Sequence, residues 1–270
     1  MTNSLAAITG ASAGIGAVFA RKLAAQGYDL LLIARRGDRL EQLGAELERT
    51  YRVHAEACIA DLSATAEMDR VAARLAAETR LDLLVNNAGF GVKGVFYEAP
   101  LEEQLTMHRL HIGAILRLTH AALPPMVARG HGAVINVASV AGFTRSPGSV
   151  SYCATKAWVN AFTEGVYLDL RSAGSPVVVQ ALCPGFTYSE FHDVAGVDRA
   201  SIPQSLWMNA EDVVDASLAG LRQRKLFVVP GWRYKLIVAL VNRIPVRMRL
   251  ALEAGAPQTR ARLAERTNPD

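Results

Sequence analysis

A tyrosine and a lysine four positions apart are the residues best suited to chemistry. Tyr152 and Lys156 lie in a helix-compatible stretch, Ser149 to Tyr167, so their side chains share one helical face. An ammonium group near a phenol favours the phenolate and lowers the tyrosine pKa from its usual value of about 10. The pair then becomes a usable proton donor and acceptor near neutrality, although such a pair also occurs by chance on ordinary exposed helices.

The elements that must position this pair alternate in type over the first 185 residues. Short apolar runs alternate with stretches of helical periodicity, and the runs are continuously apolar, as in strands buried on both faces. This predicts an α/β fold, a doubly wound parallel sheet (Rossmann fold) in three layers, α/β/α. Ligands bind such sheets at the carboxyl ends of the strands, and Ser139 follows one of these ends, 13 residues before Tyr152. The predicted strands are 5–9, 28–34, 53–59, 81–86, 133–138 and 177–182, and predicted helices include 16–26, 39–49 and 66–78.

A glycine-rich turn follows the first predicted strand and opens the first helix. Gly10, Gly14 and Gly16 would let the backbone turn tightly and approach a pyrophosphate, whose charge the helix N-terminus stabilises. Glycines alone are weak evidence, but their position after the first strand favours a dinucleotide site over a simple tight turn.

The end of the second predicted strand indicates which dinucleotide is bound. A carboxylate there reads a free ribose 2′-hydroxyl, whereas a basic residue accepts a 2′-phosphate. This chain has Arg35 and Arg36 after Ala34, with no carboxylate, and guanidinium groups can pair with a phosphate bidentately. We therefore expect NADP(H) rather than NAD(H), with Arg35 the stronger candidate; the alternative is a solvated helix start.

With these residues together, the chain resembles the short-chain dehydrogenase/reductase family over about residues 4 to 192. Five motifs occur in the order and at the spacings of that family, which makes a chance match negligible. They are the glycine turn from Thr9 to Gly16, Asp61-Leu62 after the third strand, Asn86-Asn87-Ala88-Gly89 after the fourth, Ser139 with Tyr152 to Lys156, and Pro184-Gly185 after the sixth.

The resemblance implies roles for these residues. Tyr152 would exchange a proton with the substrate oxygen, Ser139 would hydrogen-bond that oxygen, and Lys156 would lower the tyrosine pKa and hold the nicotinamide ribose. The nicotinamide supplies the hydride chemistry. The expected cofactor contacts are Gly10, Ser12, Gly14, Ile15, Gly16, Arg35, Arg36, Asp61, Leu62, Asn87, Ala88, Gly89, Tyr152, Lys156, Pro184, Gly185 and Ser189.

Two positions depart from the family pattern. His111 stands seven residues before Leu118, where relatives have an asparagine that kinks the helix and holds a water in a proton relay to the lysine. A histidine can also hold a water, which makes His111 a catalytic candidate, or the relay is altered. Ser189 replaces a common threonine but keeps the hydroxyl. Because of His111, a nucleotide-binding regulatory or scaffold protein without turnover remains the alternative to an enzyme.

Composition restricts the class and the compartment of the protein. The 270 residues are 51% apolar and 20% charged, which excludes disordered, collagen-like and disulfide-scaffold proteins. Three scattered cysteines suggest neither a disulfide framework nor a metal site, and a reducing cytoplasm fits them. No transmembrane helix is expected, since the apolar run 236–241 is far too short to span a bilayer. We expect one catalytic domain over 1–230 and a C-terminal appendage over 231–270.

The segment after Pro184-Gly185 indicates the substrate. Residues of about 186–209 would form a substrate lid, and their aromatic side chains favour a hydrophobic ketone, aldehyde or 3-oxoacyl compound, or the corresponding alcohol. Some of these aromatics would instead belong to the core. The candidate wall and lid residues are Phe90, Phe143, Phe186, Phe191, His192 and Trp207.

A basic segment lies beyond the region of resemblance. Residues 216–252 contain eight Arg or Lys and no Asp or Glu, while the whole chain carries a net charge of +4. A helix over about 233–242 would suit an anionic membrane surface, an acidic acyl carrier or a neighbouring subunit, or would be a solvated basic face. Nucleic acid is not expected, because no recognition motif is present. By analogy with relatives we expect a homo-oligomer.

Overall fold

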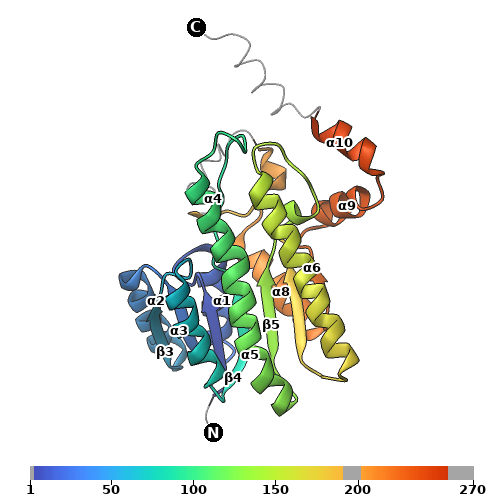
Figure 1. Ribbon diagram of the computed structural model, residues 1–270. Coiled ribbons are helices and arrows are strands. Elements are labelled where there is room, and N and C mark those ends of the chain that lie inside the picture. Colours follow the sequence, from blue (N-terminus) through green and yellow to red (C-terminus); the bar gives the residue numbers. More distant parts are fainter. Residues whose placement is uncertain (1–2, 191–201, 255–270) are drawn as a thin grey trace.

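The sheet positions the site, and its strand order places the carboxyl ends of β1 and β4 side by side. The computed structural model describes residues 3–190 and 202–254. Within these residues, seven strands form one parallel sheet in the order β3-β2-β1-β4-β5-β6-β7 (Figure 1). The strands are β1 (Leu5–Thr9), β2 (Asp29–Ala34), β3 (Ala55–Ile59), β4 (Leu81–Asn86), β5 (Ala133–Val137), β6 (Val178–Leu182) and β7 (Phe227–Val228).

Helices cover both faces of this sheet, which confirms the predicted α/β/α fold. On one face, α1, α2 and α8 pack on side chains such as Ile8 and Leu32. On the other face, α3 and α5 pack on the alternate side chains, such as Ala7 and Leu31. The helices are α1 (Gly14–Ala24), α2 (Gly37–Tyr51), α3 (Thr65–Ala76), α4 (Leu101–His108), α5 (Ile115–Arg129), α6 (Val150–Ser172), α8 (Ala210–Arg222), α9 (Trp232–Val241) and α10 (Val246–Ala254).

The predicted strands agree with the observed ones to within two residues at each end. Two of them, Leu5–Thr9 and Leu81–Asn86, have the predicted bounds. The two-residue strand β7 was not predicted, because so short a segment has no detectable alternation of side chains.

A π-helical segment, η1 (Arg109–Ala114), joins α4 to α5. The widened turn interrupts the regular helical spacing where His111 lies, and His111 is fully buried. Such local insertions are frequent at functional sites.

The C-terminal helices α9 and α10 lie beyond the last strand and project from the body of the molecule (Figure 1). α9 agrees with the helix predicted over 233–242. Within the described ranges, no helix combines the length and apolar character needed to cross a membrane. The division at residue 230 stays a prediction.

Candidate active site

Ser139 and Tyr152 meet at the carboxyl end of β5. Ser139 caps a short 3₁₀ turn after the strand, where its Oγ accepts a hydrogen bond from the amide of Ala141 at 3.1 Å. Its hydroxyl also donates to the carbonyl of Pro184 at 3.4 Å. Tyr152 lies in the first turn of α6 and is hydrogen-bonded to Ser139. The two hydroxyls therefore form one polar cluster at the predicted edge of the sheet.

Lys156 lies one helical turn further along α6 and is buried, with 5% of its surface exposed. Its Nζ donates to the carbonyl of Val137 at 2.8 Å and lies 5.8 Å from the centre of the Tyr152 ring. Burial lowers the pKa of Lys156 to about 8, against a smaller raising effect of Cys183.

The pKa of Tyr152 differs from the sequence-based expectation. Burial raises it to about 12, and the hydrogen bond with Ser139 offsets only part of that effect. The predicted lowering of this pKa by Lys156 does not occur in this arrangement, in which burial is the largest effect and the ammonium donates to the carbonyl of Val137. The phenol is therefore protonated at neutral pH, which suits a proton donor.

His111 uses both ring nitrogens in contacts within the protein. Its Nε2 accepts a hydrogen bond from the amide of Phe90 at 3.2 Å, so Nδ1 carries the proton and donates to Thr155 Oγ1 at 3.0 Å. Thr155 in turn donates to the carbonyl of Tyr152 at 2.9 Å. Burial, with the nearby charge of Lys156, lowers the pKa of His111 well below 6.5. This geometry makes a neutral bridge between the loop after β4 and α6, rather than a free relay group.

The glycine turn has the conformation that a phosphate site needs. Gly10 and Gly14 have φ values of +65° and +52°, which other residues rarely adopt. A side chain at Gly16 would collide with the carbonyl oxygen of Gly10. Helix α1 starts here without a side-chain cap and without an acidic residue in its first turn, so its amides are available to an anion.

The loop after β4 is held against this turn. Thr9 Oγ1 accepts hydrogen bonds from the amides of Asn87 at 2.8 Å and Ala88 at 2.9 Å. The side-chain amide of Asn87 donates to the carbonyls of Thr9 and Gly10. Position 89 leaves no room for a side chain, because a Cβ there would lie 2.7 Å from His111 Nε2. Asn87, Ala88 and Gly89 thus brace the turn, and their predicted cofactor contacts remain a prediction.

Arg36, rather than Arg35, lies against the glycine turn. Its guanidinium donates to Ser12 Oγ at 3.1 and 3.2 Å and pairs with Glu190 at 2.7 Å. Arg39 pairs with the other oxygen of Glu190 at 2.5 Å. Arg35 instead acts electrostatically on Asp61, whose Oδ1 accepts two hydrogen bonds from Ser63. The pKa of Asp61 is lowered, although burial opposes the effect of Ser63 and Arg35.

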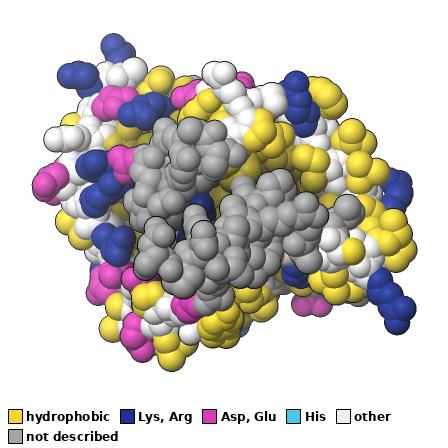
Figure 2. Space-filling view, turned by 90° about the horizontal axis from the view of Figure 1, so that it is seen from above, with side chains coloured by type: hydrophobic (Ala, Val, Ile, Leu, Met, Phe, Trp, Pro, Cys, Tyr) yellow, Lys and Arg dark blue, Asp and Glu magenta, His cyan; other side chains and the backbone are white. Residues whose placement is uncertain are grey.

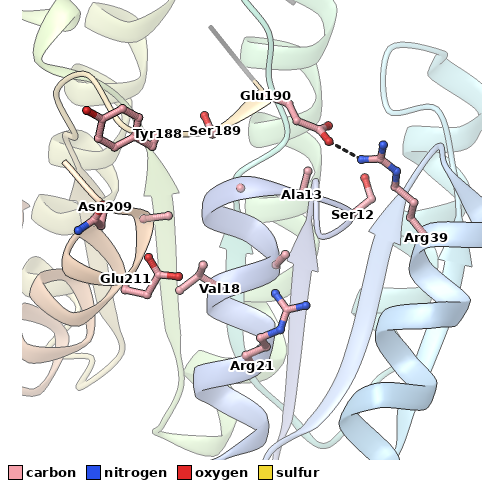
Figure 3. Close-up of a pocket in the computed structure, with 13 residues that line it drawn as sticks. Ser12, Ala13, Val18, Arg21, Arg39, Tyr188, Ser189, Glu190, Asn209 and Glu211 are labelled. Carbon is pink, nitrogen blue, oxygen red and sulfur yellow. Dashed lines mark hydrogen bonds and ion pairs between the residues drawn. The ribbon is translucent and has the colours of Figure 1, made fainter. Parts of the chain in front are cut away.

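A pocket of about 410 Å³ lies beside this turn, between α1 and the segment after β6 (Figure 3). It is lined by Ser12, Gly14, Arg39 and Glu190 among others, and by no member of the Ser139-Tyr152-Lys156 cluster. The hydroxyl of Ser189 donates to the carbonyl of Thr187, and a Cβ on Gly14 would lie 3.0 Å from its Cβ. The pocket therefore reaches the phosphate-binding end of the predicted cofactor site.

The start and the end of the predicted lid are joined to each other. The backbone amide of Met208 donates to the carbonyl of Phe186 at 3.0 Å. The backbone amide of Tyr188 donates to the carbonyl of Met208 at 2.9 Å. Trp207 contacts both aromatic rings of this stem, with centroids 5.7 Å from Phe186 and 4.9 Å from Tyr188. Phe191 and His192 lie outside the described residues.

Other predicted residues serve the core in part. The side chain of Leu62 is buried among hydrophobic residues, and Ile15 packs against the core from the first turn of α1. Phe143 packs on Phe227 of β7, with ring centres 6.2 Å apart. Phe90 contacts the ring of His111 at 6.3 Å.

Sequence reasoning missed several residues that shape the site. Thr9 and Thr155 could have been found as hydroxyl residues within the two recognised motifs. Glu190 and Arg39 gave no signal, because they are 151 positions apart and meet only in the fold. Tyr234 of α9 also gave none, yet its ring covers Gly185.

Comparison with known proteins agrees with this geometry. A relative, sulfoacetaldehyde reductase 2 of Chromohalobacter salexigens, is 36% identical over 217 residues, covering 77% of this chain and 84% of the relative. A short-chain dehydrogenase from Sphingobium yanoikuyae, solved with NADPH, is 35% identical with a TM-score of 0.81, covering 90% of this chain and 97% of the other. The bulky-bulky ketone specific alcohol dehydrogenase of Comamonas testosteroni is 29% identical with a TM-score of 0.79, covering both chains fully.

The family model described as short chain dehydrogenase matches residues 4–199, which include the glycine turn, Ser139, Tyr152 and Lys156. The match covers well over half of the chain, and the sheet order and the Ser139-Tyr152-Lys156 cluster agree with it. This chain therefore belongs to the short-chain dehydrogenase family.

Proposed function

We propose that the protein is an NADP(H)-dependent oxidoreductase that transfers a hydride between the nicotinamide and a hydrophobic carbonyl or alcohol substrate. The observation that carries the proposal is the hydrogen-bonded pair Ser139 and Tyr152, with Lys156 buried one turn away, at the carboxyl edge of the sheet. The bound nicotinamide would supply the hydride. Tyr152 would give its proton to the substrate oxygen, and Ser139 would hydrogen-bond that oxygen as negative charge develops there.

The pKa of Tyr152, about 12, supports the reductive direction at neutral pH. A phenol that stays protonated is ready to donate, whereas the reverse reaction needs a phenolate. Lys156, with a pKa of about 8, would supply positive charge near the ribose and the phenol over the lower part of the physiological pH range.

The preference for NADP(H) rests on basic side chains beside the glycine turn. Arg36 and Arg39 lie together near Ser12, and Arg35 lies close by on the side of Asp61. A ribose 2′-phosphate would replace the Glu190 carboxylate as the partner of Arg36 and Arg39. Solved structures similar to this chain include complexes with NADPH and with NAD. The proposed preference for NADP(H) therefore rests on the arginines of this chain.

The proposed substrate class rests on the aromatic stem of the lid. Phe186, Tyr188 and Trp207 form a continuous aromatic group next to Pro184, to which Ser139 is hydrogen-bonded. An apolar substrate would exclude water from the hydride step by packing on these rings. The bulky ketone specificity named for the Comamonas enzyme fits this class.

The test is turnover, with cofactor binding as a separate measurement. Purified protein is mixed with NADPH or NADH and a panel of aliphatic and aromatic ketones and aldehydes, and absorbance of the reduced nicotinamide is followed. We expect oxidation of NADPH with the bulkier substrates and tighter binding of NADPH than NADH in a fluorescence titration. Cofactor binding without turnover on any substrate would instead support a regulatory or scaffold protein, and a preference for NADH would refute the role of the arginines.

A further inference from the structure

The two C-terminal helices present apolar side chains to solvent. Trp232, Leu236 and Leu240 recur at intervals of four on α9, with exposures of 67%, 53% and 51%, so they form one stripe along the helix. Val246 and Leu250 of α10 are also more than half exposed. Single exposed apolar residues are ordinary, but a continuous group of large ones marks an interaction surface. The full set, termed here the C-terminal apolar surface, is Trp232, Leu236, Ile237, Leu240, Val246, Met248 and Leu250.

Positive charge predominates beside this surface, and Glu253 near the end of α10 is the one acidic residue of the two helices. Residues 216–252 carry eight basic side chains and no acidic one. Arg233 of α9, Arg243 of the turn between the two helices and Arg247 of α10 are exposed. The Arg233 guanidinium lies 4.8 Å from the centre of the Trp232 ring. Figure 2 shows hydrophobic and basic side chains beside one another at the right edge of the molecule, where these helices lie.

We propose that α9 and α10 dock onto an anionic lipid surface. Large apolar side chains interspersed with Arg and Lys are the pattern of helices that lie in the headgroup region of a membrane. The aromatic ring of Trp232, exposed at the start of α9, suits the boundary between headgroups and acyl chains. A second copy of this chain is the less suitable occupant, because a symmetric contact would place the same cations against one another.

The position of α9 connects this surface to the proposed substrate lid. Tyr234, on the side of α9 away from the apolar stripe, is 4% exposed and covers Gly185. Its hydroxyl donates to the carbonyl of Leu206 at 2.6 Å and accepts from the amide of Phe186 at 3.0 Å. A docked α9 would therefore hold both ends of the lid next to the lipid surface, where an apolar substrate is concentrated.

Vesicle flotation tests the proposal without any assay of activity. The full chain is mixed with phosphatidylcholine vesicles, with and without phosphatidylglycerol, and floated through a density gradient. We expect flotation with the anionic vesicles, weaker flotation at high salt, and little with phosphatidylcholine alone, since screening removes the electrostatic part.

Two double variants separate the apolar and the charged contributions. One variant combines Leu236→Glu with Leu240→Glu, and the other combines Arg243→Glu with Arg247→Glu. Each should reduce the vesicle-bound fraction at least about tenfold. Matched controls at exposed sites away from α9 and α10 are Val127→Glu with Leu168→Glu for the apolar pair, and Arg49→Glu with Arg171→Glu for the basic pair. Both controls should float like the wild type, and NADPH binding checks that every variant is folded.

Three results would overturn the proposal. The first is equal recovery of the wild type and both α9–α10 variants in the floated fraction. The second is binding to an acidic carrier protein without binding to vesicles. The third is an oligomer of the wild type, formed without lipid, that dissociates when Leu236→Glu and Leu240→Glu are introduced. The last result would assign the surface to a contact between copies of the chain.

Discussion

Tyr152 is the side chain on which the proposed chemistry depends most directly. Tyr152→Phe removes the hydroxyl that is hydrogen-bonded to Ser139 and leaves the ring in place. We expect kcat for carbonyl reduction to fall by about 10²–10⁴-fold, because a positioned proton donor contributes that much, while the Kd for NADPH stays within about twofold. Steady-state kinetics and a fluorescence titration measure the two quantities.

The matched control is Tyr167→Phe, a change of the same kind further along α6, where the ring lies beside Arg171. It should leave kcat unchanged. Full activity of Tyr152→Phe would show that the proton comes from another group.

The buried lysine sets the expected pH dependence. Lys156 carries its positive charge below a pKa of about 8 and loses it as the pH rises further. The kcat/KM for reduction should therefore be constant below about pH 7 and decline above pH 8, by up to tenfold per pH unit. A pH profile of kcat/KM with NADPH in excess measures this.

The same profile tests His111. Its pKa is lowered well below 6.5, and both ring nitrogens are engaged, so no second break is expected between pH 6 and 7. His111→Asn should reduce kcat, because Asn is too short to bridge Phe90 and Thr155, without changing the shape of the profile. A wild-type break near pH 6.5 that vanishes in His111→Asn would instead indicate proton transfer through this histidine.

Glu190 opposes the phosphate that Arg36 and Arg39 are proposed to bind. Its pKa is lowered by hydrogen bonds from these two arginines, so it is ionised at neutral pH. Glu190→Gln should tighten NADPH about two- to fivefold and leave NADH unchanged, since exposed ion pairs contribute little and only the 2′-phosphate competes for this one.

The control for that change is Glu211→Gln, which alters another acid lining the same pocket. Glu211→Gln should leave the Kd of both NADPH and NADH unchanged. Weaker NADPH binding by Glu190→Gln would contradict the competition and place the phosphate elsewhere.

At the scale of elements, the contact between α9 and the lid is the one to test. Tyr234→Phe removes the hydroxyl that joins Phe186 to Leu206 and keeps the ring on Gly185. We expect KM for the carbonyl substrate to rise about three- to tenfold and the free energy of unfolding to fall by about 1–2 kcal/mol, with NADPH binding unchanged.

Trp232→Phe, an aromatic change on the exposed side of the same helix, should alter none of these quantities. An unchanged KM in Tyr234→Phe would mean that the lid is positioned without α9.

How much the sequence predicts differs from one element to another. Strands such as β1 and β4 follow from continuous apolar runs between turns, so their bounds and the fold class were predicted. The cluster of Ser139, Tyr152 and Lys156 followed from a motif with local spacing. Other contacts join segments that are far apart in the sequence, as between Arg36 and Glu190 and between Tyr234 and Gly185. Such contacts arise from tertiary packing, so no periodicity or local spacing in the sequence indicates them.

At the scale of the whole molecule, the proposed cofactor site lies where the strand order reverses. β1 and β4 are neighbours in the sheet, and the strands that follow each of them extend in opposite directions. A dinucleotide held by the glycine turn after β1 and the loop after β4 would contact both halves of the sheet. Its binding should therefore stabilise the whole domain rather than one loop.

Thermal unfolding measures that stabilisation. NADPH at about 100 times its Kd adds about 2.7 kcal/mol, which corresponds to a rise in Tm of about 5–11 °C for a domain of this size. NADH at the same concentration, if it binds about ten times more weakly, adds only about half as much free energy. Arg36→Ala with Arg39→Ala should remove the difference between the cofactors while keeping the rise caused by NADH. Equal rises with NADPH and NADH in the wild type would contradict the proposed 2′-phosphate site, and no rise with either would contradict a dinucleotide site between the two halves of the sheet.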